Sequence, residues 1–276
     1  MNNHEFLQEV HSFIDKTYKE FEDYQEIVKD ILQEFSRVCK KNNIPFWLAY
    51  GNMIGAVRDH SQLPWDYDVD VLTPVDERIR LIKALDNDLS ENYSYAYWTN
   101  TKKYPTICLR VYNKKYAWMA LHVDVFFLIG APTEEEEQLR FIKKVGNLWS
   151  IREKKYILYH LPLPNRIKQF FYRTAIKFRY IFITDGVLNK REKDILYRYP
   201  MKSSKFYMPF GGIKLAIFPK EVFETKMVEV NGTSYPIPSG YDLFLTKVYG
   251  NWHNYLSINR LFDEFYSMKK IVDERI

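Results

Sequence analysis

Cysteine is scarce in this sequence, which has only Cys39 and Cys108 among its 276 residues. Neither their number nor their separation fits a disulfide framework, a structural zinc site or a redox pair. We therefore expect two buried, reduced thiols. Apolar runs long enough to span a membrane are also missing, and the first residues, MNNHEFLQEVH, carry no signal-peptide pattern. Together these absences favour a protein of the cytoplasmic side.

Apolar and aromatic residues, in contrast, are abundant. They make up 46% and 17% of the chain, which excludes a disordered polypeptide and allows a large buried core. The net charge of +5 is small, but lysines and arginines concentrate between residues 152 and 202. This basic segment suits an anionic partner, such as lipid headgroups, nucleic acid or a phosphorylated polymer.

Helical and strand-like patterns are mixed along the chain. Apolar residues at helical spacing predict helices over 24–42, after Pro74, from Thr133 past Trp149, and over 259–273. Alternating or β-branched runs predict strands at 46–50, 66–72, 93–98, 106–112 and 121–129, and Asn231-Gly232 predicts a hairpin turn.

No internal repeat or low-complexity linker divides these elements. We expect one compact α+β unit over residues 1–276, with a catalytic core at 22–130. A helical basic segment at 131–205 and a C-terminal part at 206–276, which completes the site, would follow.

The stretch PWDYDVDVL places three carboxylates at alternate positions, Asp66, Asp68 and Asp70. In a strand these side chains share one face, with Tyr67 and the valines on the other. A rise of about 3.3 Å per residue separates successive carboxylates by roughly 6–7 Å. Such charges repel unless a cation lies among them, and hard oxygen ligands suit Mg²⁺ or Mn²⁺. A solvated acidic cluster is the less favoured alternative.

A third ligand is expected from another strand. Asp124 is a lone acid in the apolar run LHVDVFFL, and a carboxylate in that setting is rarely buried unless it is paired or bound to a metal. Upstream, Gly51-Asn52 joins a strand to a short helix. Backbone N–H groups at such a turn favour phosphate.

Two arginines are candidates for binding phosphate, Arg58 after the short helix and Arg110 within a strand. His122 alternates with Asp124 on the same face, although a structural role is favoured for it. Aromatic faces that hold a quaternary ammonium group are conceivable at Trp65, Tyr67, Tyr249 and Trp252, but core packing is favoured for each.

Three motifs carry a resemblance to a known family: Tyr50-Gly51, Gly55-Ala56-Val57-Arg58, and Pro64-Trp65-Asp66 through Asp70. They resemble the LicD family, which has the nucleotidyltransferase (polymerase-β-like) fold and includes bacterial phosphocholine transferases and fukutin-related proteins. The resemblance is closest over 43–72, weaker to Leu128, and returns in IPSGYDLFLTKVYGNW. This chain has Tyr67 where bacterial members usually have Asp, and Asn52 where Thr or Ser is common.

The resemblance implies a mixed sheet flanked by helices, with a helical basic insertion. It also implies Mg²⁺ or Mn²⁺ on Asp68, Asp70 and Asp124, and a phosphate-facing Gly51-Asn52 turn. Phosphocholine would pass from CDP-choline to a hydroxyl of a lipid-linked or oligosaccharide acceptor, such as a cell-surface polysaccharide or teichoic-acid precursor. Asp124 would accept the hydroxyl proton.

Alternatives remain open from the sequence. The transferred unit could be ribitol phosphate or glycerol phosphate, or the reaction could be nucleotidyl transfer. A non-catalytic module that binds nucleic acid or lipid is less favoured, because all three aspartates are present.

Residues 168–182 form an apolar stripe of Phe171, Ala175, Phe178 and Phe182 with basic residues on its flanks, Arg173, Lys177 and Arg179. This pattern is typical of a helix lying in an anionic membrane interface. Packing of the stripe on the core is the alternative. We therefore expect a cytoplasmic enzyme, peripheral at the inner face of the membrane.

Overall fold

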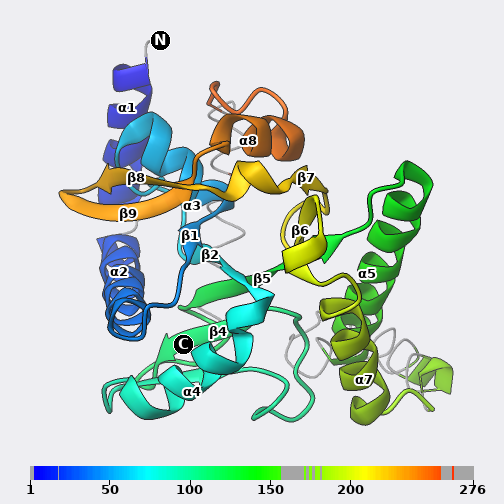
Figure 1. Cartoon of the computed structure of the whole chain (residues 1–276). Coiled ribbons are helices and arrows are strands. Elements are labelled where there is room, and N and C mark those ends of the chain that lie inside the picture. Colours follow the sequence, from blue (N-terminus) through cyan, green and yellow to red (C-terminus); the bar gives the residue numbers. More distant parts are fainter. Residues whose placement is uncertain are drawn as a thin grey trace.

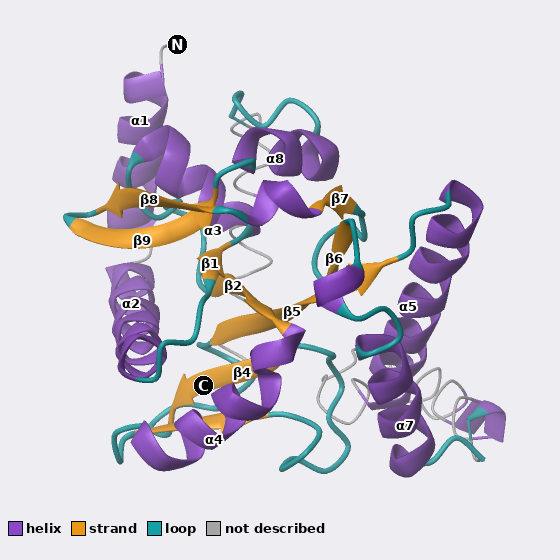
Figure 2. Ribbon diagram, in the orientation of Figure 1, coloured by secondary structure: helices purple, strands orange, loops and turns teal. Residues whose placement is uncertain are grey.

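The computed structural model describes residues 3–17, 19–156 and 182–255, together with residues 171, 174–175, 178–180 and 263. Within these ranges a mixed sheet of seven strands has helices around it, and a separate hairpin lies beside it (Figures 1 and 2). This arrangement confirms the predicted α+β class with a mixed sheet flanked by helices.

The described helices are α1 (Asn3–Thr17), α2 (Lys19–Lys41), α3 (Tyr50–Ile54), α4 (Arg78–Asp88), α5 (Glu135–Tyr156), α7 (Asp185–Leu196) and α8 (Tyr241–Tyr249). The described strands are β1 (Trp47–Leu48), β2 (Val69–Pro74), β3 (Tyr93–Ala96), β4 (Leu109–Asn113), β5 (Val123–Ala131), β6 (Phe206–Phe210), β7 (Phe218–Pro219), β8 (Thr225–Val230) and β9 (Thr233–Pro238). A π-helical turn, Gly55–Asp59, continues α3.

Helix α2 forms because its apolar residues recur at helical spacing, and the structure buries that stripe. Its buried members are Val28, Ile31, Leu32, Phe35, Val38 and Cys39. The helix ends where Asn43 adopts a left-handed conformation (φ 51°) and Ile44 N–H donates to the carbonyl of Cys39. Cys39 and Cys108 are both buried and unpaired, as expected.

Strand β5 is the centre of the sheet, and all nine of its residues are buried. It runs parallel to β2 and antiparallel to β4 and β6. The register places Asp70 and Arg110 on either side of Asp124. Since side chains in register share a face, the sheet collects these three charged residues at one place.

The predicted hairpin is confirmed. Strands β8 and β9 are joined by Asn231 and Gly232, which both have positive φ angles, 47° and 77°. Two successive positive φ values are what a tight type I′ turn requires. The hairpin is tied to the sheet by the Trp47 indole N–H, which donates to Thr225 Oγ1 at 3.0 Å.

Each predicted strand of the sheet differs from the observed strand at one or both ends, and two of these differences bear on the site. Strand β2 begins at Val69, because Asp66 N–H closes a turn onto the carbonyl of Leu63 and Gln25 holds the carbonyl of Asp66 at 2.8 Å. The strand predicted over 46–50 ends at Leu48, and Tyr50 already begins α3. Residues 66–68 therefore lie before the strand, and strand alternation does not determine the directions of the Asp66 and Asp68 side chains.

Two predicted helices fall wholly or mostly outside the described residues. Over 259–273 only residue 263 is described, and over 168–182 only isolated positions are. Among those positions, Phe178 and Phe182 are 73% and 90% exposed. Across the part of the chain that the structure describes, no helix is both long and apolar enough to cross a bilayer.

Candidate active site

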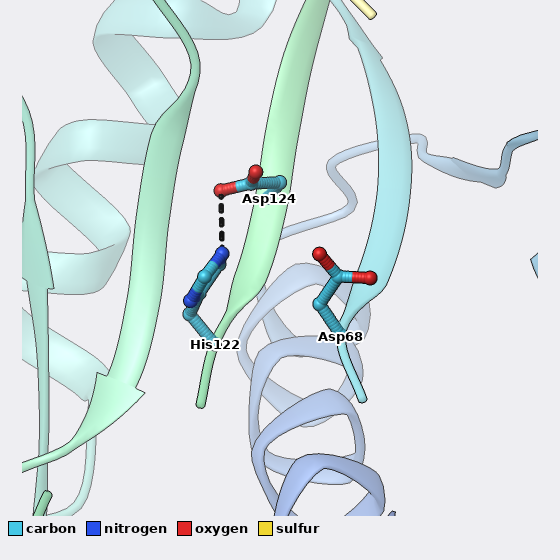
Figure 3. A group of neighbouring side chains, drawn as sticks. All are labelled: Asp68, His122 and Asp124. Carbon is cyan, nitrogen blue, oxygen red and sulfur yellow. Dashed lines mark ion pairs between the residues drawn. The ribbon is translucent and has the colours of Figure 1, made fainter. Parts of the chain in front are cut away.

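The site is built where β2, β5 and β4 lie side by side. Asp68 directly precedes β2, while His122 directly precedes β5 and Asp124 is its second residue. One ligand atom from each of Asp68, His122 and Asp124 lies within 4.8 Å of the others. Figure 3 shows Asp124 turned toward His122, with the Asp68 carboxylate beside them on the neighbouring segment of the chain. Asp124 and His122 are buried, and Asp68 is partly accessible.

Arg110 on β4 neutralises part of this charge. Its Nε lies 2.7 Å from Asp124 Oδ1 and its Nη2 lies 3.3 Å from Oδ2, so the pair is bidentate. Burial alone disfavours the ionised form of Asp124, but Arg110 and His122 outweigh it and hold the pKa of this carboxyl well below its usual range. Asp124 is therefore a carboxylate at neutral pH and a weak proton acceptor.

Asp70 lies beside Asp124 in the parallel register but is not part of the close group of three. Burial, followed by the charges of Asp68 and Asp124, raises the pKa of Asp70 well above its usual value. Burial also raises the pKa of Asp68. Carboxylates that resist ionisation in this way mark a place where added positive charge is favourable. The residues present thus fit a divalent cation.

His122 supplies a second indication of a missing partner. Both of its ring nitrogens are buried and neither makes a hydrogen bond to a described residue; Nε2 lies 3.4 Å from Asp124 Oδ1. Carboxylate oxygens with one imidazole nitrogen suit Mn²⁺ or Mg²⁺ and do not exclude Zn²⁺. Sequence alternation had placed His122 on the face of Asp124 but gave it a structural role. The observed cluster holds it beside Asp68.

Gly51 and Asn52, the two residues of the predicted phosphate turn, have different structural roles. The Asn52 side chain donates to the carbonyl of Asp68 at 3.2 Å and accepts from the N–H of Asp70 at 2.6 Å. It therefore fixes the backbone that carries the aspartates. A Cβ on Gly51 would lie 2.9 Å from Asp66 Oδ2, so glycine admits this carboxylate close to α3. Contact of this turn with phosphate remains a prediction.

Arg58 is engaged elsewhere among the described residues. Its guanidinium pairs with Asp59 at 2.8 Å, approaches the carbonyl of Trp252 at 3.4 Å and lies 3.7 Å from the centre of the Tyr255 ring. None of these contacts is with Asp68, Asp70 or Asp124. A role for Arg58 in binding diphosphate stays a prediction, which would require this side chain to move.

Tyr249 at the end of α8 brings the C-terminal motif to the site. Its hydroxyl oxygen is buried without a hydrogen-bond partner among the described residues. Burial, and then the charges of Asp70, Asp66 and Asp68, raise the pKa of Tyr249. The hydroxyl thus lies within electrostatic reach of the aspartates.

Of the other aromatic candidates, Tyr67 is also affected by the charges of the site, because burial and the charge of Asp68 raise its pKa. Trp65 and Trp252 are buried, and the Trp252 indole N–H donates to Asp242 at 3.1 Å while its ring stacks on His253. These two tryptophans are therefore core residues in this structure, as favoured from the sequence.

Comparison with known proteins agrees with the motifs. Residues 43–160 match the family described as LicD/FKTN/FKRP, nucleotidyltransferase domain. This range contains Asp68, Asp70, Arg110, His122 and Asp124. Over 244 residues the chain is 24% identical to the lipopolysaccharide cholinephosphotransferase LicD of Haemophilus influenzae, covering 83% of this chain and 89% of that protein.

Proposed function

Because residues 43–160 match the LicD/FKTN/FKRP, nucleotidyltransferase domain family, we propose that this chain is a metal-dependent transferase that moves phosphocholine from CDP-choline to a hydroxyl of a glycan. Similarity to a cholinephosphotransferase along most of both chains supports the choice of transferred group. The Asp68–His122–Asp124 cluster carries the proposal, because it lies in the matched region and fits a divalent cation.

The proposed ligands are Asp68 and Asp124, with Asp70 and His122 adjoining them. A divalent cation bound there supplies a Lewis acid that offsets negative charge on phosphate oxygens. Asp70 stays a predicted ligand, because the strand register places it beside Asp124. Asn52 keeps two of the aspartates in place through hydrogen bonds with the backbone of Asp68 and Asp70.

In the proposed reaction the acceptor oxygen forms a bond to the phosphorus of phosphocholine. The bond from that phosphorus to the bridging oxygen of the diphosphate breaks, and CMP leaves with the electron pair. The proton of the hydroxyl passes to a base. Phosphoryl transfer of this kind depends mainly on positioning and electrostatic stabilisation.

The side chains of the site fit these tasks. Arg110 presents a planar cation next to the carboxylates and can donate to a phosphate oxygen while it remains near Asp124. The family resemblance implies that Asp124 accepts the proton, but the lowered pKa of this carboxyl favours the role of ligand. The imidazole of His122, whose Nε2 lies 3.4 Å from Asp124 Oδ1, is a second candidate for the proton.

The proposed partners follow from this chemistry. The donor is CDP-choline, and the acceptor is a lipid-linked or oligosaccharide glycan such as a teichoic-acid precursor. A cytoplasmic position at the inner face of the membrane remains part of the proposal, together with an anionic membrane surface as partner.

A donor screen tests the proposal. Calorimetry or thermal shift would compare CDP-choline, CDP-ribitol, CDP-glycerol and CTP, each with Mn²⁺, Mg²⁺ or EDTA. We expect metal-dependent binding of CDP-choline in the wild type and its loss in Asp124→Asn. Tighter binding of CDP-ribitol or CDP-glycerol would identify ribitol phosphate or glycerol phosphate as the transferred unit in place of phosphocholine. Binding of CTP alone would favour nucleotidyl transfer, and metal-independent binding of every nucleotide would refute the assigned site.

A further inference from the structure

A groove of about 480 Å³ lies between α5 and α7, apart from the aspartate cluster. The two helices run side by side at the right of Figures 1 and 2. Residues of α5 that line the groove are Arg140, Lys143, Lys144, Asn147, Leu148 and Ile151, and those of α7 are Arg191, Asp194 and Ile195. None of them belongs to the proposed active site.

Helical spacing explains why these side chains meet. The lining residues of α5 recur at intervals of three and four, so they form one stripe along the helix. Arg191, Asp194 and Ile195 do the same on α7. The groove is thus a continuous surface made by two facing stripes, in which Ile151 is partly exposed while Leu148 and Ile195 are buried beneath the charged side chains.

The charge of the groove is strongly positive, with four cations against Asp194. Arg140 approaches Glu136 at 3.5 Å, but both side chains are largely exposed, at 72% and 88%. Among the described residues no carboxylate lies within ion-pair distance of Lys143, Lys144 or Arg191, and all three are exposed. These three charges are therefore available to an anion.

The frame of the groove is rigid. Arg152 of α5 and Glu192 of α7 form a buried ion pair at 2.9 Å, and the Tyr97 hydroxyl donates to Glu192 at 2.7 Å. Breaking a buried pair of this kind is costly, so the two helices are held at a fixed spacing. The cations are therefore held close together before a ligand binds.

We propose that this groove binds a phosphorylated amphiphile, with the phosphate among Lys143, Lys144 and Arg191 and the hydrocarbon against Ile151 and the aliphatic stems of the lysines. The volume lies within the range of small-molecule sites and exceeds what one phosphate fills. A partly exposed apolar side chain and the lysine stems beside the cations suit a lipid better than a fully solvated anion. The source to which we commit is the headgroup of an anionic phospholipid.

Vesicle sedimentation tests this binding without any assay of activity. Vesicles of phosphatidylcholine alone would be compared with vesicles that also contain phosphatidic acid, at low and high salt. The test variant combines Lys143→Gln, Lys144→Gln and Arg191→Gln. The matched control combines Lys154→Gln, Lys190→Gln and Lys202→Gln, which removes the same charge from exposed positions outside the groove.

We expect the wild type and the control variant to bind vesicles with phosphatidic acid, and the test variant to bind about a hundredfold more weakly. Equal loss of vesicle binding in both variants would show that binding responds to net charge only, which would overturn the groove as the binding site. Unchanged binding in the test variant, or no binding by the wild type, also overturns it. Thermal unfolding of each variant checks that the fold is kept.

Soluble ligands separate the possible sources. Calorimetry would compare a short-chain phosphatidic acid below its aggregation concentration with pyrophosphate and with single-stranded RNA. Binding of the lipid, lost in the test variant, supports the proposal. Binding of pyrophosphate or RNA as tight as that of the lipid, and lost in the same variant, overturns it. Because no arm uses CDP-choline, failure here is distinct from failure of the proposed transferase.

Discussion

Asp68→Asn probes the metal assignment most directly, because it keeps the shape of the side chain and removes one ligand charge. Without metal, burial and the neighbouring Asp124 raise the pKa of Asp68, so its ionised form opposes folding at neutral pH. The amide has no such charge. In EDTA we therefore expect the variant to be at least as stable as the wild type.

The effect of metal works in the opposite direction. A cation present at about 100 times its dissociation constant stabilises the folded wild type by about 2.7 kcal/mol. If loss of one of the clustered ligands weakens binding about a hundredfold, the same concentration stabilises the variant by only about 0.4 kcal/mol. The order of stabilities should therefore reverse between EDTA and excess Mn²⁺.

Urea unfolding followed by tryptophan fluorescence measures both conditions, and CMP release gives turnover. Asp76→Asn is a suitable control, because Asp76 is exposed and lies outside the cluster. Turnover of Asp68→Asn should fall by about two to three decades. Equal metal-induced stabilisation in wild type and Asp68→Asn, or near wild-type turnover in excess EDTA, would refute the reasoning.

Three further changes test neighbouring parts of the argument. Arg110→Gln leaves Asp124 buried beside like charges and should lower the free energy of unfolding by about 3 kcal/mol in EDTA, with part restored by Mn²⁺; an unchanged urea midpoint would contradict the ion pair. Tyr249→Phe removes a buried hydroxyl that has no hydrogen-bond partner among the described residues, so stability should hold while CMP release falls; destabilisation with full activity would assign it to the core instead. Glu34 has its pKa lowered to about 2, first by its hydrogen bond from Arg37, so it stabilises the fold above its ordinary pKa and loses this as pH falls toward 2. Glu34→Gln should lower the free energy of unfolding by about 1–2 kcal/mol at pH 6, a modest loss because Arg37 is half exposed and screened, and should not change it near pH 2. Urea unfolding of wild type and variant at several pH values measures this, and a difference that did not shrink toward pH 2 would disprove the prediction.

Several parts of this protein follow from short stretches of sequence. The stripe of α2 and the Asn231-Gly232 turn depend on residues a few positions apart, and both occur as predicted. A lone Asp124 in an apolar run also signals a special environment, because an unpaired buried charge is costly. The family resemblance rests on equally local motifs, and the matched range 43–160 confirms it.

The membership of the site depended on tertiary structure. His122 joins Asp68, Arg110 pairs with Asp124 and Tyr249 comes within electrostatic reach of the aspartates only because strand register and the docking of α8 bring distant residues together. Alternation within one strand predicts a shared face but neither the partner strand nor where pairing begins. Strand β2 starts at Val69 because a turn at Leu63–Asp66 and the side chains of Gln25 and Asn52 take up the preceding backbone. Those bonds join residues that no local pattern connects, and they decided how the aspartates face one another.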